Sequence, residues 1–332
     1  MSFVERIDTH AHFIPPFYRA ACEESGHGNP DGMPAIPPWS EEAHLVLMKD
    51  LSITRSILSI SSPGVYLKAG DYLSSQKLTR QCNEFAGDLV RRRPKEFGFW
   101  ASLPLPDVAS TLEEIPFALD TLKADGFALE TNYYGTYLGD SAFDAIFEEL
   151  NRRKATVFIH PTTPCMKHQN GGNHTAVTVL PQYPNPMFEF MFDTARAIIN
   201  LFLCGTITRC PDIKFVIPHA GGAITPVIQR FCGFATAILD SDVEVSTQIV
   251  KETFARQFYF DLAGFPFPDQ ILGLLRYVEP SRLLYGSDYP FTPVAGVKAL
   301  AESMSTGLEG VFPDETVRRG IYTGNAQELL KL

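Results

Sequence analysis

The sequence lacks the features that several large classes of protein require. Its most apolar stretch, Phe188–Ile207, is interrupted by Glu189, Asp193 and Arg196, whereas a membrane-spanning helix tolerates few charges. The first six residues lack the apolar stretch of a secretion signal. No basic run is present, and 28 Lys and Arg stand against 38 Asp and Glu, which gives a net charge of −10. We therefore expect no membrane partner and no nucleic-acid partner.

Cysteine is sparse and unpaired in sequence. Six cysteines are spread over 332 residues, and none forms a Cys-x-x-Cys pair. This spacing argues against a zinc–cysteine site and favours a cytoplasmic protein whose reduced thiols mostly fill the core. Apolar residues make up 45% of the chain, so a large core is available and wholesale disorder is excluded.

Short apolar runs alternate with longer segments of helical periodicity. The runs are rich in Val, Ile, Phe and Tyr, which is typical of strands that are covered on both faces of a parallel sheet. Eight runs occur: Arg6–Phe13, Ile53–Ile60, Phe97–Leu103, Gly126–Asn132, Ala155–His160, Ile213–Pro218, Gln257–Leu262 and Arg282–Gly286. This alternation predicts a single (β/α)8 TIM barrel domain over residues 1–332. An open doubly wound sheet is the alternative, although no Gly-x-Gly-x-x-Gly motif follows the first run.

The segments between the runs predict helices. Five of them have an apolar face: Ser75–Arg92, Ala109–Lys123, Asp140–Arg153, Phe188–Cys210 and Pro226–Leu239. Acidic residues in a first turn predict two further helix starts, at Ser40–Glu42 and Pro313–Thr316.

Two segments that leave predicted strands are longer than ordinary loops. Ile14–Trp39 follows the first strand and Thr162–Pro186 follows the fifth, and both are rich in Pro and Gly. Sites in a barrel are built at the C-terminal ends of the strands, so these segments are candidate lids or pocket walls. Subunit contact or surface decoration is the alternative.

Histidine and aspartate lie at the ends of four predicted strands. His10 and His12 in the first strand point to the same side, because side chains alternate along a strand. His160 ends the fifth run, His219 follows the sixth and Asp288 follows the eighth. A single histidine in such a place is usually a core residue. Four strands that present such side chains at one end of a barrel favour a metal site.

These side chains divide into ligands and a neighbour of the ion. His10, His12, His160 and Asp288 supply three imidazoles and one carboxylate, a set that suits Zn²⁺ and, with water and substrate, Mn²⁺. His219 would lie beside the ion, where it would act as a general base or orient Asp288. We expect one divalent ion, because the fourth strand ends without a lysine that could be carboxylated to bridge two.

Together these motifs resemble the amidohydrolase superfamily, and more narrowly its decarboxylase branch, typified by aminocarboxymuconate-semialdehyde decarboxylase and γ-resorcylate decarboxylase. The motifs are His-x-His, a histidine after the fifth strand, His-Ala-Gly-Gly after the sixth and Gly-Ser-Asp-Tyr-Pro after the eighth. Three segments, Ile7–Tyr18, Gly98–Pro104 and His160–Cys165, resemble fungal 6-methylsalicylate decarboxylases.

The resemblance implies the same four ligands, a catalytic His219 and a homodimer or larger homo-oligomer. One segment departs from the pattern. Residues 39–48 lack the arginines with which the semialdehyde decarboxylase holds a dicarboxylate, so a monocarboxylate substrate is favoured.

The resemblance therefore predicts non-oxidative loss of CO2 from a small aromatic 2-hydroxy acid, with 6-methylsalicylate and 3-methylphenol as the expected substrate and product. Asp288 is the first candidate for the proton donor and His219 the second. Trp39 and Phe291 are candidate walls of the apolar slot that the ring needs.

Three alternatives remain open. A lactone- or amide-opening hydrolase would use the same metal and the same residues. A barrel that binds metal without catalysis would retain the ion without turnover. A purely structural fold would satisfy five polar residues at strand ends and hold no stoichiometric metal.

Overall fold

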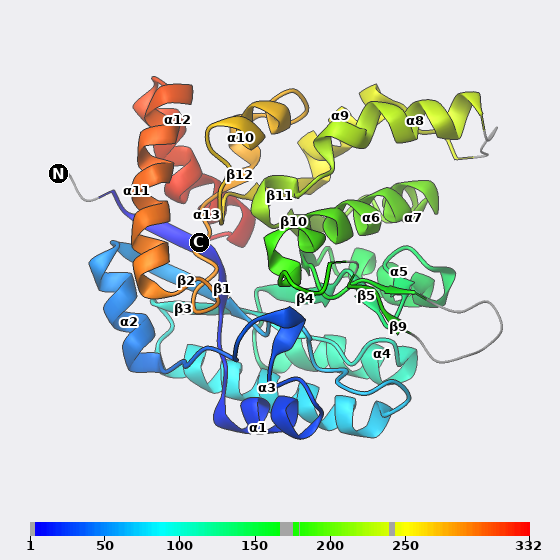
Figure 1. Ribbon diagram of the computed structural model, residues 1–332, viewed down its shortest axis with the longest axis vertical. Helices are drawn as coiled ribbons and strands as arrows, with labels where there is room; N and C mark the ends of the chain where they lie inside the picture. Colours follow the sequence, from blue (N-terminus) through cyan, green and yellow to red (C-terminus); the bar gives the residue numbers. More distant parts are fainter. Residues whose placement is uncertain (1–3, 167–174, 179, 239–242) are drawn as a thin grey trace.

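The computed structural model describes residues 4–166, 175–178, 180–238 and 243–332 (Figure 1). Eight parallel strands form one sheet, and their order in the sheet follows their order in the chain. They are β1 Arg6–His12, β2 Ile53–Ser59, β3 Phe97–Ser102, β4 Gly126–Glu130, β7 Thr156–His160, β10 Lys214–Ile217, β11 Phe258–Asp261 and β12 Leu283–Leu284. All eight predicted runs are strands, with ends that differ by one or two residues at most, and the (β/α)8 barrel is confirmed.

The sheet closes where the segment after β12 meets β1. Parallel bridges join Asp8 to Tyr285 and Ala11 to Tyr289. The backbone N of Thr9 donates to the carbonyl of Tyr285 at 3.0 Å, so the seam has the same kind of hydrogen bonding as the other strand pairs. The first and last strands of the chain are therefore neighbours.

One side chain from each strand fills the barrel interior. These residues are Ile7, Ile57, Trp100, Ala128, Phe158, Val216, Tyr259 and Leu284, and Ala326 and Leu329 of α13 (Asn325–Leu330) pack with them. Trp100, the largest of these side chains, is 1% exposed. Because this layer is apolar and closed by α13, polar side chains gather at the other end of the barrel, beyond the C-terminal ends of the strands.

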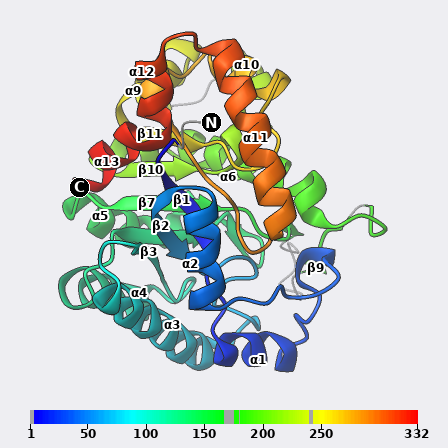
Figure 2. The ribbon, with the colours of Figure 1, turned by 90° about the vertical axis from the view of Figure 1, so that its left-hand side faces the viewer.

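The helices surround the barrel (Figures 1 and 2). Besides α13 they are α1 Pro16–Glu24, α2 Glu41–Asp50, α3 Tyr72–Arg92, α4 Val108–Pro116, α5 Asp144–Arg152, α6 Glu189–Leu203, α7 Thr206–Arg209, α8 Ile228–Ala237, α9 Thr247–Gln257, α10 Asp269–Leu274, α11 Val294–Val311 and α12 Glu315–Arg319. Both predicted helix starts are confirmed, since Ser40 caps α2 and Asp314 caps α12 through hydrogen bonds to backbone N–H groups. No helix in the described part of the chain combines the length and apolar character that crossing a bilayer requires.

Two predicted helices are interrupted, and a third, Asp140–Arg153, is α-helical only from Asp144, after a 3₁₀ turn over Ser141–Phe143. The segment 188–210 forms α6 and α7 rather than one helix, because Gly205 adopts φ +73° between them. Residues 109–123 form α4 only as far as Pro116, followed by a π-helical turn over Phe117–Thr121. Proline lacks the N–H that a continuing α-helix needs, so the regular hydrogen bonding changes there.

The long segments after β1 and β7 contain more structure than predicted. The first holds α1, which buries Tyr18 and Cys22 one turn apart, and a short 3₁₀ helix, Pro30–Gly32. The second holds the strand pair β8 (Cys165–Met166) and β9 (Thr175–Ala176), while residues 167–174 and 179 lie outside the described residues. The Oγ1 atom of Thr163 donates to Oδ1 of Asp31 at 2.5 Å, so the two segments are joined.

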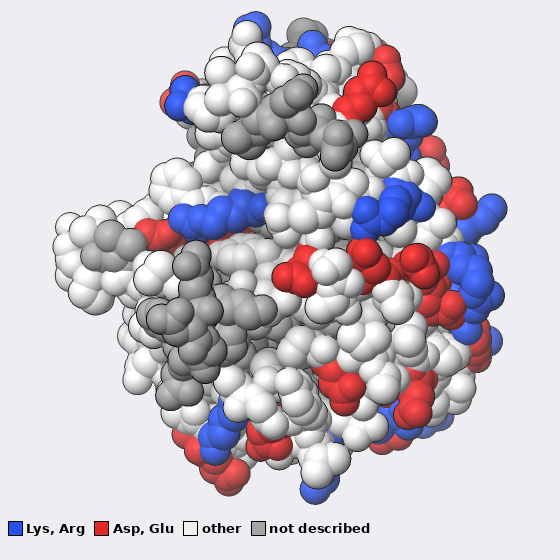
Figure 3. Space-filling view, turned by 90° about the vertical axis from the view of Figure 1, so that its right-hand side faces the viewer, with Lys and Arg blue, Asp and Glu red and all other residues white. Residues whose placement is uncertain are grey.

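The surface mixes both signs of charge with wide uncharged areas, as the face in Figure 3 shows. Large apolar side chains are exposed on α6 and α8 and just before α6. They include Met187, Phe192, Phe234 and Ile238. α6 and α8 pack together through Phe202 and Phe231, whose ring centroids are 6.3 Å apart.

Candidate metal centre

The predicted ligand residues meet at the C-terminal end of the barrel. His10 and His12 come from β1, His160 ends β7 and Asp288 follows β12. Each residue offers one ligand atom, and the four atoms all lie within 4.8 Å of one another. The Nε2 atoms of His10 and His12 are 3.2 Å apart, and Oδ1 of Asp288 lies 3.4 Å and 3.2 Å from them. The geometry therefore brings together all four residues in one buried group.

Hydrogen bonds on the outer side of two rings fix which nitrogen faces this group. Nδ1 of His10 donates to Oδ2 of Asp261 at 2.9 Å. Nδ1 of His160 donates to the carbonyl oxygen of Pro161 at 2.8 Å. Both acceptors lack a proton, so the proton of each neutral ring is held at Nδ1 and the lone pair lies at Nε2. This is the tautomer that a metal ligand requires.

The donor set fits a divalent cation. The Nε2 lone pairs of His10 and His160 face the carboxylate of Asp288, whose Oδ1 lies 3.4 Å and 3.2 Å from Nε2 of His10 and His12. Nδ1 of His12 is satisfied separately, 3.0 Å from Oγ of Ser59. Such donors repel one another unless a cation lies between them, and three nitrogens with one oxygen suit Zn²⁺ or Mn²⁺. The four residues therefore form a metal site.

Titration of the same groups without a metal leads to the same conclusion. Burial lowers the pKa of His12 below its usual range and that of His160 well below it. Burial opposes the charge of His10 too, but Asp261 and Asp288 outweigh it and raise the pKa of His10 to about 10. A proton on His10 thus supplies positive charge to the site, and a bound divalent ion would displace this proton.

His219 lies beside the ligand group and outside it. Its Nε2 is 3.8 Å from Oδ2 of Asp288, and its ring centroid is 5.1 Å from that of His10. Its side chain is 13% exposed and that of Asp288 is 22% exposed, whereas the histidine ligands are buried. Small molecules therefore meet the site from the side of His219 and Asp288. The placement is the one expected from the sequence, and a catalytic role for His219 stays a prediction.

The backbone at His219 is held in an unfavourable conformation. His219 and Ala220 have φ of +53° and +51°, a region that costs an L-residue about 1–2 kcal/mol. Oδ1 of Asp261 accepts a hydrogen bond from the backbone N of His219 at 3.1 Å, while Oδ2 accepts from His10. One carboxylate thus fixes a metal ligand and the neighbouring histidine together.

Asp261 was missed in the sequence. It ends the apolar run Phe-Tyr-Phe-Asp of β11, in the same way that His160 ends β7, and this similarity was the signal that could have found it. Asp8 was also given no role. Its carboxylate accepts hydrogen bonds from the backbone N and from Oγ of Ser287, which tie the turn before Asp288 to β1.

Glu130, at the end of β4, lies behind His160 and is not one of the ligands. Its Oε2 is 3.7 Å from Nδ1 of His160 and has no hydrogen-bond partner among the described residues. Burial, together with the negative charges of Asp31 and Asp193, raises the pKa of Glu130 well above its usual range. Glu130 thus lies against the outer nitrogen of His160, and the number of ions stays a prediction.

The two predicted substrate contacts lie in different surroundings. The ring of Phe291 packs edge-on against His12 with a centroid distance of 5.5 Å, and Phe190 of α6 does the same against His160 at 6.1 Å. Aromatic rings therefore border the ligands on two sides. Trp39 packs instead against Phe13 and Phe85, at 6.3 Å and 6.2 Å.

Trp39 is linked to the barrel through His44 of α2. Its Nε1 donates to Nδ1 of His44 at 3.1 Å. The ring of His44 is fully buried and packs at 5.1 Å from that of Tyr289, the residue after Asp288. His44 therefore serves in packing and does not face solvent.

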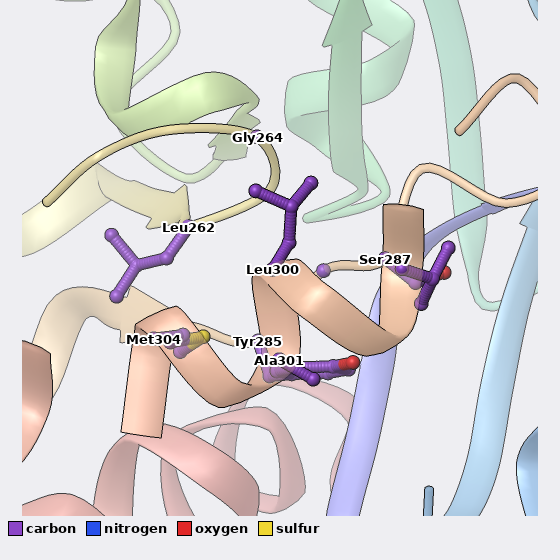
Figure 4. A pocket seen from close by; sticks show the side chains of 9 residues that line it. Leu262, Gly264, Tyr285, Ser287, Leu300, Ala301 and Met304 are labelled. Atoms are coloured by element: carbon purple, nitrogen blue, oxygen red, sulfur yellow. The ribbon is translucent and has the colours of Figure 1, made fainter. Parts of the chain in front are cut away.

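A small pocket lies behind the metal centre, between α11 and the segment from β12 to Ser287 (Figure 4). Its volume of about 10 Å³ holds a single water molecule at most. Leu262, Leu300 and Met304 contribute apolar side chains to it. An aromatic acid does not fit there.

Comparison with known proteins agrees with this geometry. A family model described as "Amidohydrolase" matches residues 7–332. "Decarboxylase macB" of Penicillium terrestre is 38% identical over 327 residues, which cover 96% of this chain and 93% of that protein. "6-methylsalicylic acid decarboxylase" of Penicillium expansum is 36% identical over 327 residues, which cover 98% of this chain and 95% of that protein. The crystal structure of "Amidohydrorolase II" superposes with a TM-score of 0.86 at 32% identity, covering 99% of this chain and 100% of that one.

The link between Asp261 and His10 predicts the effect of Asp261→Asn. An asparagine has only one acceptor oxygen for the donors that Asp261 satisfies. If this oxygen faces Nδ1–H of His10, the NH2 group meets the backbone N–H groups of His219 and Ala263; if it faces those N–H groups, the NH2 group meets Nδ1–H of His10 or forces the proton onto Nε2, where the metal binds. We expect the affinity for the divalent ion to fall about 10- to 100-fold. Competition with a chromophoric chelator at constant pH measures this.

The matched control is Asp125→Asn. Asp125 is also largely buried, where it accepts from the backbone N of Phe99 and pairs with Arg55, but it precedes β4 at the other end of the barrel. Its replacement should leave metal affinity unchanged. Wild-type affinity in the Asp261 variant would show that the hydrogen bond to His10 does not orient the ligand.

Proposed function

The chain belongs to the amidohydrolase family, and from this membership we propose that it is a metal-dependent decarboxylase that converts 6-methylsalicylate into 3-methylphenol and CO2. The observation that carries the proposal is the buried group of three imidazoles and one carboxylate with His219 at its open side. A relative named for this reaction supports the choice of substrate, since it is 36% identical over nearly the whole chain.

We propose Zn²⁺ as the ion, with Mn²⁺ as the alternative, held by His10, His12, His160 and Asp288. When bound, the ion supplies positive charge that neutralises the carboxylate and the ortho oxygen of a 2-hydroxybenzoate. The chain contributes little positive charge of its own nearby, because residues 39–48 contain no arginine and the net charge is −10. One carboxylate and one phenol oxygen therefore match the site better than a dicarboxylate.

His219 is proposed as the group that delivers the proton. A proton on the ring carbon that bears the carboxylate interrupts conjugation, the C–C bond then opens with its electrons kept on the ring, and recovered aromaticity drives out CO2. The sequence favoured Asp288 as donor, which requires a raised pKa. Burial raises the pKa of Asp288, but the neighbouring imidazoles of His10, His12 and His219 outweigh it and hold the pKa well below its usual range.

Asp288 is accordingly proposed as a ligand that also orients the donor. Its Oδ1 faces the two histidines of β1, and its Oδ2 faces Nε2 of His219 at 3.8 Å. A carboxylate in this place directs the imidazole toward the open side of the site. Proton transfer by a positioned group contributes about 10²–10⁴-fold to rate.

The ring slot is proposed to include Phe291, with Trp39 as a second wall. Phe291 supports this role because its ring already packs against His12 and is partly exposed. Trp39 has weaker support, since its contacts are with Phe13, Phe85 and His44.

We further propose that the chain forms a homodimer in the cytoplasm. The exposed apolar side chains on α6 and α8, among them Phe192 and Phe234, support an interface with a second copy. All six cysteines are free thiols in the structure, which suits a reducing compartment.

Decarboxylation is tested directly with purified, zinc-loaded protein. We expect 6-methylsalicylate to give equal amounts of CO2 and 3-methylphenol, and 2-methylbenzoate, which lacks the ortho hydroxyl, to remain unchanged. A chelator should abolish turnover, and Zn²⁺ or Mn²⁺ should restore it. His219→Asn should lower kcat about 10²–10⁴-fold while the metal content stays the same, because His219 is not a ligand.

Two results would contradict this proposal. Failure to turn over any 2-hydroxybenzoate would reject the decarboxylase. A ring-opened acid formed from a lactone, without CO2, would identify the hydrolase on the same barrel.

Separate variants test the two walls. Phe291→Ala should raise KM roughly 2- to 10-fold, since an edge-to-face aromatic contact contributes about 0.5–1.5 kcal/mol. Trp39→Ala should raise KM if Trp39 touches the ring. Phe85→Ala is the control for packing, because Phe85 contacts Trp39. Equal changes in KM for the Trp39 and Phe85 variants would identify Trp39 as a packing residue only.

The oligomeric state is tested by light scattering after gel filtration. We expect twice the mass of 36.9 kDa for the wild type and a single chain for Phe234→Glu, because a buried unpaired charge opposes association. Val46→Glu is the control, since Val46 is 61% exposed on α2, away from the proposed interface. A wild-type protein that remains a monomer at all concentrations would refute the homodimer.

A further inference from the structure

The turn that carries His219 is left-handed throughout. Four consecutive residues, His219 to Gly222, have φ of +53°, +51°, +83° and +57°. Glycine tolerates this region, but His219 and Ala220 do not adopt it without support. Strained conformations of this kind persist where the surrounding structure fixes them, so the contacts around the turn decide where the His219 ring points.

Gln270 bonds to both ends of this turn. Its Nε2, on α10, donates to the carbonyl oxygen of His219 at 2.7 Å and to that of Gly222 at 3.1 Å. The other backbone polar group of His219, its N–H, donates to Oδ1 of Asp261 at 3.1 Å. The N–H and the C=O of His219 are thus each held by a side chain from a different element.

The rest of the turn rests on α6. The backbone N of Ala223 donates to the carbonyl of Met191 at 3.0 Å. A Cβ at Gly222 would lie 2.7 Å from the same carbonyl oxygen, so the chain has no room to move in that direction. Gln270 closes the other side, and it is not one of the four metal ligands.

We propose that Gln270 is a positioning residue, which acts through the His219 backbone to hold the imidazole beside Asp288. Asp261 performs the same service at the N–H, but it also holds His10, so its variants change the metal centre as well. Variants of Gln270 remove support from the His219 turn without removing a hydrogen bond to a metal ligand. The expected fall in kcat rests on the proposed decarboxylation. The expected change in the orientation of the His219 ring rests on the geometry of the turn alone.

The first test compares Gln270→Ala and Gln270→Glu with the wild type. Alanine removes both hydrogen bonds, and glutamate places a carboxylate against two carbonyl oxygens. A displacement of about 1 Å at a reacting group costs up to 10²-fold, so we expect kcat to fall about 10- to 100-fold. Metal content should remain that of the wild type, and KM should change less than 2-fold.

Gln257→Glu is the matched control. Gln257 also donates its Nε2 to a backbone carbonyl, that of Cys210 at 3.1 Å, and it is 3% exposed. It precedes β11 at the end of the barrel away from the metal centre. This variant reports the general cost of losing such a bond, and we expect its kcat to match the wild type. A loss in kcat as large as that of Gln270→Glu would overturn the proposal.

Coupling to His219 distinguishes positioning from a general structural role. If Gln270 acts through the imidazole, Gln270→Ala should have no further effect on the residual rate of His219→Ala. A second loss of 10-fold or more in the double variant would overturn the proposal, because the effect would then reach the reaction by another route.

A readout without turnover keeps the inference separate from the proposed function. In zinc-loaded protein labelled with 15N-histidine, the signals lost in His219→Ala identify the His219 ring. In Gln270→Ala these signals should shift or broaden while those of His27, on the outer segment, stay in place. Unchanged His219 signals would overturn the inference. Changed signals in a protein that turns over no benzoate would support the positioning and reject the decarboxylase.

Discussion

The mutual repulsion of lone pairs at the mouth of the barrel is the constraint on which the rest of this structure depends. The outward hydrogen bonds of His10 and His160 commit their inner nitrogens to face a carboxylate in a buried space. Positive charge, supplied by a divalent ion, satisfies these lone pairs and the carboxylate together. The elements that hold the rings in place, Asp261 and the carbonyl of Pro161, are therefore as necessary to the centre as the ligands.

The fold supplies this arrangement through its interior. Each strand contributes one apolar side chain to a layer that fills the barrel, and Phe158 of that layer packs at 5.0 Å from the ring of His10. The layer supports the base of the centre, while α13 closes the far end. Among the described residues of the centre, the three histidine ligands are buried, and His219 and Asp288 are partly exposed to solvent. The apolar layer thus closes the site from below and leaves the opposite side, toward the ends of the strands, for a small acid.

The strands and the ligand residues could be predicted from the sequence, because the spacing of apolar residues indicates which positions are buried. The eight strands are apolar on both faces, and the polar residues that end four of them mark the functional end directly. The parts that failed depend on contacts across the chain. Gly205 divides a predicted helix through a positive φ that spacing does not reveal, and the order inside residues 14–39 depends on burying Tyr18 and Cys22. The lowered pKa of Asp288 depends on three histidines from two other strands, so the sequence suggested the opposite direction.

The position of the seam has a consequence for how the protein is made. The histidines of β1 leave the ribosome well before Asp288, yet all three residues contribute to one ligand group across the closing strand pair. A nascent chain can hold the two histidines of β1 for most of its synthesis without a complete site. Capture of the ion therefore requires that the ring of strands is complete, and the bound ion then cross-links β1 to the segment after β12.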